Sequence, residues 1–162
     1  MERYFAYPFT LQDIHSRTLY HTHNLEHGKG GFEMKDMLVE SIEMSCPICG
    51  GTHMVEKRLH ETQALFKGEV INYEEVYFLC DKADDEENEF VPAKVMDSNL
   101  LKVRDAYRTI KGLLTSNEIA EIRSYYSLTQ SEFAALLGWG EVTVTRYESK
   151  TIQDETYDSV MR

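Results

Sequence analysis

Two helix start signals stand close together in the last third of the chain. Thr115 is followed three residues later by Glu118, and Thr129 is followed in the same way by Glu132. In such a capping box the Thr hydroxyl and the Glu carboxylate satisfy backbone N–H groups that a helix leaves unpaired in its first turn. The spacing therefore predicts short helices over residues 117–126 and 130–137.

Glycines and apolar periodicity extend this helical pattern in both directions. Gly138-Trp139-Gly140 supplies a tight turn, after which helical spacing resumes over residues 141–149, and a further helix is expected from Asp154. Upstream, apolar residues at helical spacing predict a longer helix that begins at Ser98 or Asn99. Residues 98–162 are thus predicted to form an all-α unit.

The capped helix, the glycine turn and the next helix are spaced as in a helix-turn-helix, whose second helix lies in the DNA major groove. Five residues are candidates for DNA contacts, with Gln130 and Lys150 expected on phosphates and the others on bases or phosphates: Gln130, Thr143, Thr145, Arg146 and Lys150. In the alternative interpretation, an ordinary helical bundle, Arg146 pairs with a carboxylate. The pattern from Thr129 to Glu148 resembles the Xre/Cro-like helix-turn-helix family.

Three cysteines form the second chemical signal. Cys46-Pro47-Ile48-Cys49 is a knuckle whose two thiolates can bind one zinc ion, and Cys80 can supply a third ligand. The sequence does not choose the fourth ligand. His53, His60, Asp81, Asp84 or a water molecule are the alternatives, and buried neutral cysteines without metal are the competing interpretation.

The segment around the cysteines predicts a small β-rich unit. Strands are expected over residues 54–59 and 70–80 with a turn or bulge at Gly68, followed by an acidic loop or linker over residues 81–89. A short helix is expected over residues 32–42, and residues 1–43 as a whole are expected to be a poorly structured, dispensable extension. The predicted class is α+β, with a zinc-ribbon-like β domain over residues 44–97 before the helical domain over residues 98–162.

Composition excludes several classes of protein. The formal charge of the 162 residues is −11, which argues against a basic coat for nucleic acid but not against a local DNA-reading face. Long apolar runs and a signal-peptide pattern are absent from the sequence, so no membrane association is expected and a cytoplasmic protein is predicted. We expect no enzyme, because the chain has no phosphate-binding loop or nucleophile elbow, and residues 84–87 are best explained as a solvated loop.

Together, the Cys-Pro-x-Cys-Gly knuckle, the later cysteine and the Arg146-Tyr147-Glu148 segment resemble the MqsA/YgiT-type antitoxins over residues 45–162. The resemblance implies a zinc-binding domain that contacts a toxin protein, and a homodimeric domain that binds a double-stranded operator and represses its own operon. Ala83 stands where the pattern would have a fourth cysteine. The end at Arg162 suggests a short version or a fragment.

Two other functions remain open at this stage. Residues 45–98 hold most of the acidic excess, which suits an adaptor that binds a basic partner protein through its β domain. A stand-alone Xre-type regulator without a toxin is the other alternative.

Overall fold

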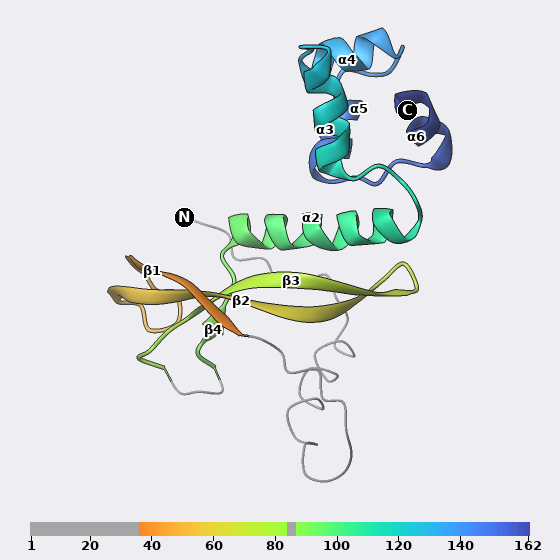
Figure 1. Ribbon diagram of the computed structural model, residues 1–162. Coiled ribbons are helices and arrows are strands. Elements are labelled where there is room, and N and C mark those ends of the chain that lie inside the picture. Colours follow the sequence, from red (N-terminus) through yellow and green to blue (C-terminus); the bar gives the residue numbers. More distant parts are fainter. Residues whose placement is uncertain (1–35, 84–86) are drawn as a thin grey trace, which may run out of the picture.

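The computed structural model describes residues 36–83 and 87–162, and it is a mixed α+β structure in which the strands precede the helices (Figure 1). Its strands form one antiparallel sheet in the order β1-β2-β3-β4: β1 Met37–Ser45, β2 Thr52–Phe66, β3 Glu69–Leu79 and β4 Glu89–Phe90. The helices are α2 Ala93–Ile110, α3 Ser116–Tyr125, α4 Gln130–Leu136, α5 Thr143–Ser149 and α6 Glu155–Met161. No helix of the described residues is long and apolar enough to cross a membrane.

The long β2–β3 hairpin confirms the two strands expected from the sequence. It is paired in register from Phe66 opposite Glu69 to Glu56 opposite Leu79. Its two-residue turn needs positive φ at both positions, which Lys67 (50°) and Gly68 (84°) supply. Strand β2 extends beyond the expected residues 54–59 at both ends, whereas β3 differs from the expected residues 70–80 by one residue at each end.

Strand β1 corrects two expectations. The helix expected over residues 32–42 is wrong in its described part, because Met37–Ser45 pair with β2 from Met37 opposite Leu59 to Ser45 opposite Thr52. Ile42 and Met44, two positions apart, both pack against the core, so a period of two fits these apolar residues once a partner strand is present. Residues 37–43 are therefore part of the sheet. The rest of the expected extension, residues 1–35, lies outside the described residues.

Helix α2 begins at Ala93, five residues before the expected start, with Pro92 as its N-cap residue. Asn99 is therefore inside the helix, and its side chain is buried against β3. Its amide donates to the Val76 carbonyl (2.8 Å) and accepts from the Val76 N–H (3.0 Å). Strand β4 pairs only with Phe78 and Leu79 of β3. The Asn99 side chain of α2 therefore forms hydrogen bonds with the Val76 backbone groups, which the short β4 does not reach.

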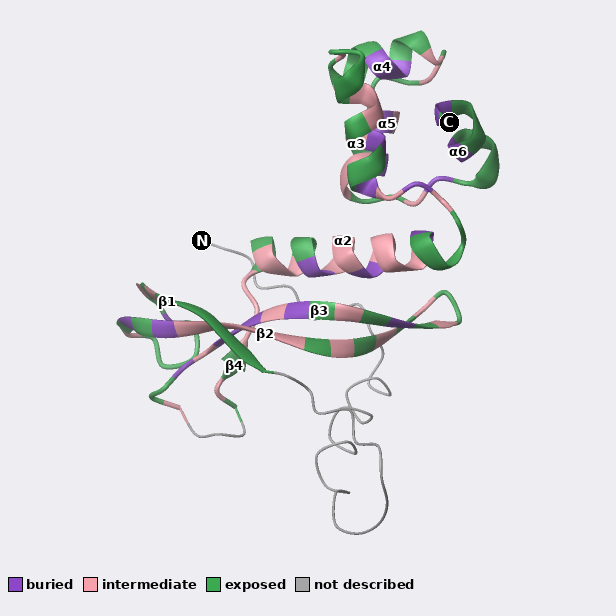
Figure 2. Ribbon diagram, viewed as in Figure 1, coloured by how far each residue is buried: buried purple, intermediate pink, exposed green. Residues whose placement is uncertain are grey.

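Buried residues occur in both the sheet and the helices (Figure 2), and many of the apolar ones gather in two clusters. The cluster in the sheet unit contains Cys46, Val55, Phe78 and Cys80, and Val95 in the first turn of α2 packs against it. The cluster in the helical unit contains Leu114, Ile119, Phe133, Ala134, Val144, Tyr147 and Met161. Helix α2 thus contributes to the sheet unit at its N-terminal end, earlier than the boundary expected at residue 98.

The other end of α2 is joined to the helical unit by Arg108, whose side chain is 0% exposed. Its guanidinium donates to the Tyr147 and Thr151 carbonyls (2.7 Å each) and to Gln153 (3.0 Å). It also pairs with Asp105 (2.6 Å). Because Tyr147 belongs to the last turn of α5, Arg108 satisfies a carbonyl at the end of that helix.

Local signals placed the remaining helices well. Both capping boxes are present, with Thr115 and Glu118 at the start of α3 and Thr129 and Glu132 at the start of α4. Asp154 caps α6 by accepting from the backbone N–H of Tyr157 (3.0 Å). The N-cap interactions depend only on residues three apart in the sequence, which is why the sequence predicts them.

Candidate functional site

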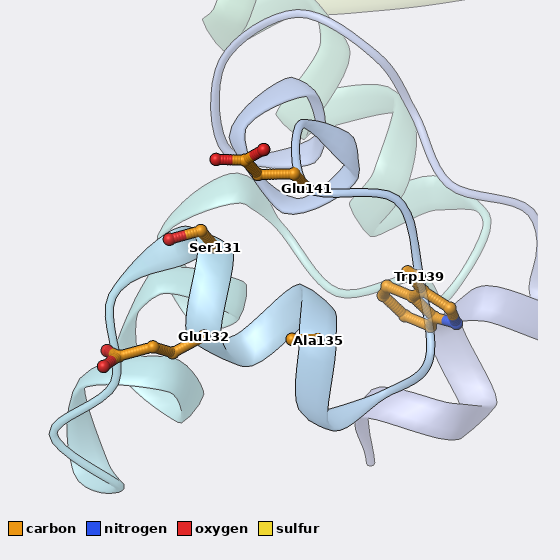
Figure 3. A pocket seen from close by; sticks show the side chains of 5 residues that line it. All are labelled: Ser131, Glu132, Ala135, Trp139 and Glu141. Atoms are coloured by element: carbon orange, nitrogen blue, oxygen red, sulfur yellow. The ribbon is translucent and has the colours of Figure 1, made fainter.

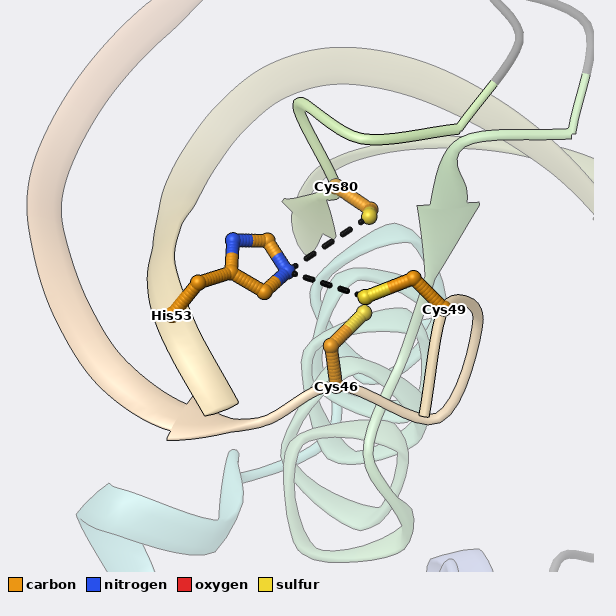
Figure 4. A group of neighbouring side chains, drawn as sticks. All are labelled: Cys46, Cys49, His53 and Cys80. Atoms are coloured by element: carbon orange, nitrogen blue, oxygen red, sulfur yellow. Dashed lines mark hydrogen bonds between the residues drawn. The ribbon is translucent and has the colours of Figure 1, made fainter. Parts of the chain in front are cut away.

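The three cysteines come together with His53 at one end of the sheet (Figure 4). One ligand atom from each of Cys46, Cys49, His53 and Cys80 lies within 4.8 Å of the others, so the group could hold a metal ion. Three of the four residues are buried, and only Cys49 is exposed. The structure thus brings together the three predicted cysteine ligands and adds a histidine as the fourth.

A tight turn between β1 and β2 positions the first two thiols. The Cys46 N–H donates to the Gly51 carbonyl, and the Gly50 N–H donates to the Cys46 carbonyl (2.9 Å each). Gly50 has a φ of 72°, a left-handed conformation that a glycine adopts at no steric cost. His53 follows at the start of β2 and Cys80 directly after β3, so the pairing of β2 with β3 carries both to the turn.

The distances fit a tetrahedral metal centre. Nε2 of His53 lies 3.4 Å from Sγ of Cys49 and 3.6 Å from Sγ of Cys80. With metal bonds of about 2.3 Å to sulfur and about 2.05 Å to nitrogen, a tetrahedral zinc ion separates its nitrogen and sulfur ligands by about 3.6 Å. The two nitrogen–sulfur distances match this value, and the Cys₃His donor set is one that zinc commonly takes.

The other nitrogen of His53 is held by acceptors. Nδ1 lies 2.8 Å from the Met54 carbonyl and 2.9 Å from a carboxylate oxygen of Asp81. Both acceptors favour a proton on Nδ1, which leaves the lone pair of Nε2 directed toward the thiols. Asp81 is thus a partner of His53 and not itself a member of the group of candidate ligands.

The surroundings of the thiols differ. Burial opposes ionisation of Cys46, but hydrogen bonds from the backbone of Cys49 and Ile48 hold the pKa of its thiol below the usual value. Burial raises the pKa of the Cys80 thiol. A metal ion would compensate the buried negative charge that the thiolates bring, because metal binding requires the deprotonated form.

The remaining candidates for the fourth ligand are elsewhere or undescribed. His60 lies opposite Glu75 in the neighbouring strand, and its Nε2 is 3.3 Å from the Glu75 carboxylate. Asp84 is outside the described residues. His53 is one of several candidates in the sequence, and nothing local distinguishes it, because the choice depends on strand register.

The five residues predicted to contact DNA lie on α4, α5 and the residue after α5. Arg146 and Lys150 are exposed, and the Arg146 side chain forms no ion pair with any described residue. The alternative in which Arg146 pairs with a carboxylate therefore gains no support from the described part of the chain. Thr143, at the first position of α5, is half-buried.

Gln130 and Thr145 are hydrogen bonded to each other. The Thr145 hydroxyl donates to the Gln130 side-chain oxygen (2.8 Å), and the Gln130 amide donates to the Glu148 carboxylate (2.6 Å). This links the start of α4 to the exposed side of α5. The Thr145 hydroxyl and the Gln130 side chain are thus already hydrogen bonded within the protein. A hydrogen bond from either group to DNA must share or replace these internal bonds.

An ion pair between α3 and α5, which the sequence does not predict, holds α5 in place. Arg123 of α3 forms two hydrogen bonds with Glu148 of α5, Nε to Oε1 (2.7 Å) and Nη2 to Oε2 (3.1 Å). Its third nitrogen donates to the Leu128 carbonyl (2.9 Å). The two residues are far apart in the sequence and no local pattern connects them. Together with the buried Val144 and Tyr147, this pair fixes which side of α5 faces outward.

A hollow beside α4 is lined by Ser131, Glu132, Ala135, Trp139 and Glu141 (Figure 3). The Glu132 carboxylate accepts hydrogen bonds from the Thr129 N–H (2.8 Å) and hydroxyl (2.7 Å). These bonds hold the pKa of Glu132 below its ordinary value. One of the two carboxylates that line the hollow is therefore engaged in capping α4.

The chain matches no protein-family model, no curated protein and no solved structure.

Proposed function

We propose that this protein is a sequence-specific DNA-binding repressor in which α4, the turn and α5 act as an Xre/Cro-like helix-turn-helix. The observation that carries the proposal is the outward presentation of Arg146 on a helix whose other side is locked by Val144, Tyr147 and the Arg123–Glu148 pair. The Arg146 guanidinium forms no ion pair within residues 36–83 and 87–162, and from a rigid short helix it can donate two hydrogen bonds to guanine O6 and N7 in the major groove.

Helix α5 also presents further exposed side chains beside Arg146. Exposed residues recur along one side of α5 and its flanks at Val142, Thr145, Arg146 and Lys150. Gln130, at the start of α4, is close enough to Thr145 to join the same interface. We propose that the protein binds a palindromic operator as a homodimer, with half-sites about one helical turn apart.

We further propose that Cys46, Cys49, His53 and Cys80 bind Zn²⁺ and that the ion stabilises the sheet unit. All four residues come from the turn, β2 and the end of β3, so one ion would connect the three segments. Small units with limited apolar cores are commonly stabilised by a structural metal of this kind.

We also propose, from the sequence resemblance, a role as the antitoxin of a type II toxin-antitoxin system that represses its own operon.

The sheet unit supports an interaction with a partner protein through one specific feature. Strand β1 is an edge strand of the described sheet, and three consecutive residues on it are about half-exposed, Met37, Leu38 and Val39. An adaptor that binds a basic protein at this acidic unit is the second candidate function, and a regulator without a toxin is the third.

The test is a fluorescence-anisotropy titration of the zinc-loaded full chain with DNA from upstream of its own gene, at fixed salt and with scrambled competitor. We expect competitor-resistant binding that Arg146→Ala weakens by about tenfold or more while relaxing discrimination between operator and scrambled DNA. Lys94→Ala is the matched control, because it removes the same charge from an exposed position in the first turn of α2.

Unchanged discrimination in Arg146→Ala would overturn the assignment of α5 as the reading helix. If the wild-type chain shows no specific binding, the repressor proposal fails and the adaptor becomes the better explanation.

A further inference from the structure

Two neighbouring tyrosines at the end of α3 are unusually exposed. Tyr125 is 83% exposed and Tyr126 is 61% exposed. Their rings meet edge to face, with centroids 5.0 Å apart and an interplanar angle of 89°. The described residues leave both rings largely in solvent, so packing within the helical unit does not explain the pair.

The pair lies next to the surface that we propose for DNA binding. Tyr125 is the last residue of α3 and Tyr126 is its C-cap, and the chain turns at Ser127 (φ 55°) to reach the capping box of α4. The turn is held by a bond from the Ser127 N–H to the Ser124 carbonyl (2.9 Å).

The same turn is anchored to α5. Arg123 donates to the Leu128 carbonyl and to Glu148, and the Gln130 amide donates to Oε2 of the same carboxylate. The two tyrosines therefore sit on a rigid turn that is fixed relative to the reading helix.

Resting on the proposed DNA-binding function, we infer that the hydroxyls of Tyr125 and Tyr126 donate hydrogen bonds to the phosphate backbone beside the operator half-site. Tyrosine hydroxyls are ordinary donors to phosphate, and such contacts fix the register of a protein on the duplex without reading sequence. The paired rings limit each other's freedom, which lowers the entropy cost of holding the hydroxyls in place.

The distribution of charge favours neutral donors at this position. Arg123, the basic residue in the last turn of α3, is paired with Glu148. Helix α4 contains no lysine or arginine. Arg146 and Lys150 belong to α5 and its C-cap, so the side chains that the α3–α4 turn offers to phosphate are uncharged.

The experiment compares the zinc-loaded full chain with the Tyr125→Phe/Tyr126→Phe double variant by anisotropy, on operator and on scrambled DNA, over a series of salt concentrations. Phenylalanine keeps both rings and removes only the hydroxyls. We expect affinity for the two DNAs to fall by the same factor, about tenfold or more, with the slope of log K against log salt unchanged. Lys150→Ala should instead reduce that slope by about one.

Two controls make the test specific. Tyr157→Phe removes a hydroxyl on α6, where the ring packs against Trp139 and Tyr147, and should leave affinity unchanged. Methylphosphonate substitutions along the operator backbone should weaken wild-type binding at particular positions, and those positions should become insensitive in the double variant.

An unchanged affinity of the double variant, beside specific binding by the wild type, would overturn the inference and leave the repressor function standing. A loss confined to operator DNA would also overturn it, because a phosphate contact cannot distinguish sequences directly. If the wild-type chain binds no DNA, both proposals fall and the tyrosine pair becomes a candidate contact for a protein partner.

Discussion

Nδ1 of His53 lies 2.9 Å from the carboxylate of Asp81, while Nε2 of the same ring faces the thiols of Cys49 and Cys80. A carboxylate in this position orients a histidine ligand and raises the basicity of its free nitrogen. Asp81 is therefore a positioning residue for the candidate metal centre. Its side chain is 69% exposed, so its electrostatic contribution is reduced by solvent.

We expect Asp81→Ala to lower zinc affinity by about tenfold, near the lower end of the effect of such partners, because the Met54 carbonyl remains as an acceptor for Nδ1. Competition with a chromogenic chelator measures the change. Asp97→Ala removes an exposed carboxylate of α2 and should bind zinc as the wild type does. Equal affinities for both variants would contradict the positioning role.

The choice of His53 over His60 shows what local sequence patterns cannot determine. Both residues belong to β2, and both have a suitable side chain. His53 lies opposite Met44 at the end of the sheet where the Cys46–Cys49 turn begins, whereas His60 lies opposite Glu75 in the body of the hairpin. Only the register of β2 against its neighbours separates them, and register is a property of the folded sheet.

The same distinction explains the other outcomes. The caps of α3 and α4 join residues three apart, and the sequence predicts both. Strand β1 depends on pairing with β2, and the early start of α2 accompanies packing against β3. Local apolar spacing therefore predicts a helix for the first, and spacing with N-cap candidates predicts a late start for the second. Contacts between distant residues, such as Arg123 with Glu148, have no local signature.

Asn99 gives a prediction about the junction of α2 and the sheet. Replacing it with Ala leaves the N–H and carbonyl of Val76 without the side-chain amide that now pairs with both, and we expect a loss of about 2 kcal/mol in the free energy of unfolding. Chemical denaturation of the zinc-loaded chain measures it.

Asn99→Asp is the informative partner variant. Its carboxylate can still accept from the Val76 N–H but cannot donate to the carbonyl, so its stability should not exceed that of the wild type. Full stability of Asn99→Ala would mean that water replaces the amide at this edge.

Arg108 gives a larger predicted effect. Arg108→Met removes the ion pair with Asp105 and the hydrogen bonds to two carbonyls and to Gln153, all at a side chain that is fully buried. We expect a loss of about 3 to 5 kcal/mol in the free energy of unfolding, since the partners stay buried and unpaired. Calorimetry or denaturation of the full chain tests this.

Arg104→Met, one turn earlier on α2, is the control. Arg104 is partly buried and its change should cost less than about 1 kcal/mol. Similar losses for Arg104→Met and Arg108→Met would contradict a specific role for the Arg108 hydrogen bonds.

Asp158 gives a prediction about acid stability. Burial opposes its ionisation, but hydrogen bonds from Gln153, from the Leu114 N–H and from Arg162 hold its pKa below the ordinary value of 3.8. Because the unfolded carboxyl binds a proton at higher pH than the folded one, its contribution to stability is complete above about pH 5 and is lost as the pH falls through the folded pKa.

We expect Asp158→Asn to lower the free energy of unfolding by about 1 to 3 kcal/mol near neutral pH. The difference from the wild type should shrink as the pH falls from about 5 through the folded pKa of Asp158, because the unfolded wild-type chain takes up the proton first. Urea denaturation at several pH values measures both curves, and Glu155→Gln, an exposed change on the same helix, should follow the wild type. A difference that stays constant from neutral to acidic pH would show that the charge of Asp158 does not contribute to stability, and that its role is shape and hydrogen bonding alone.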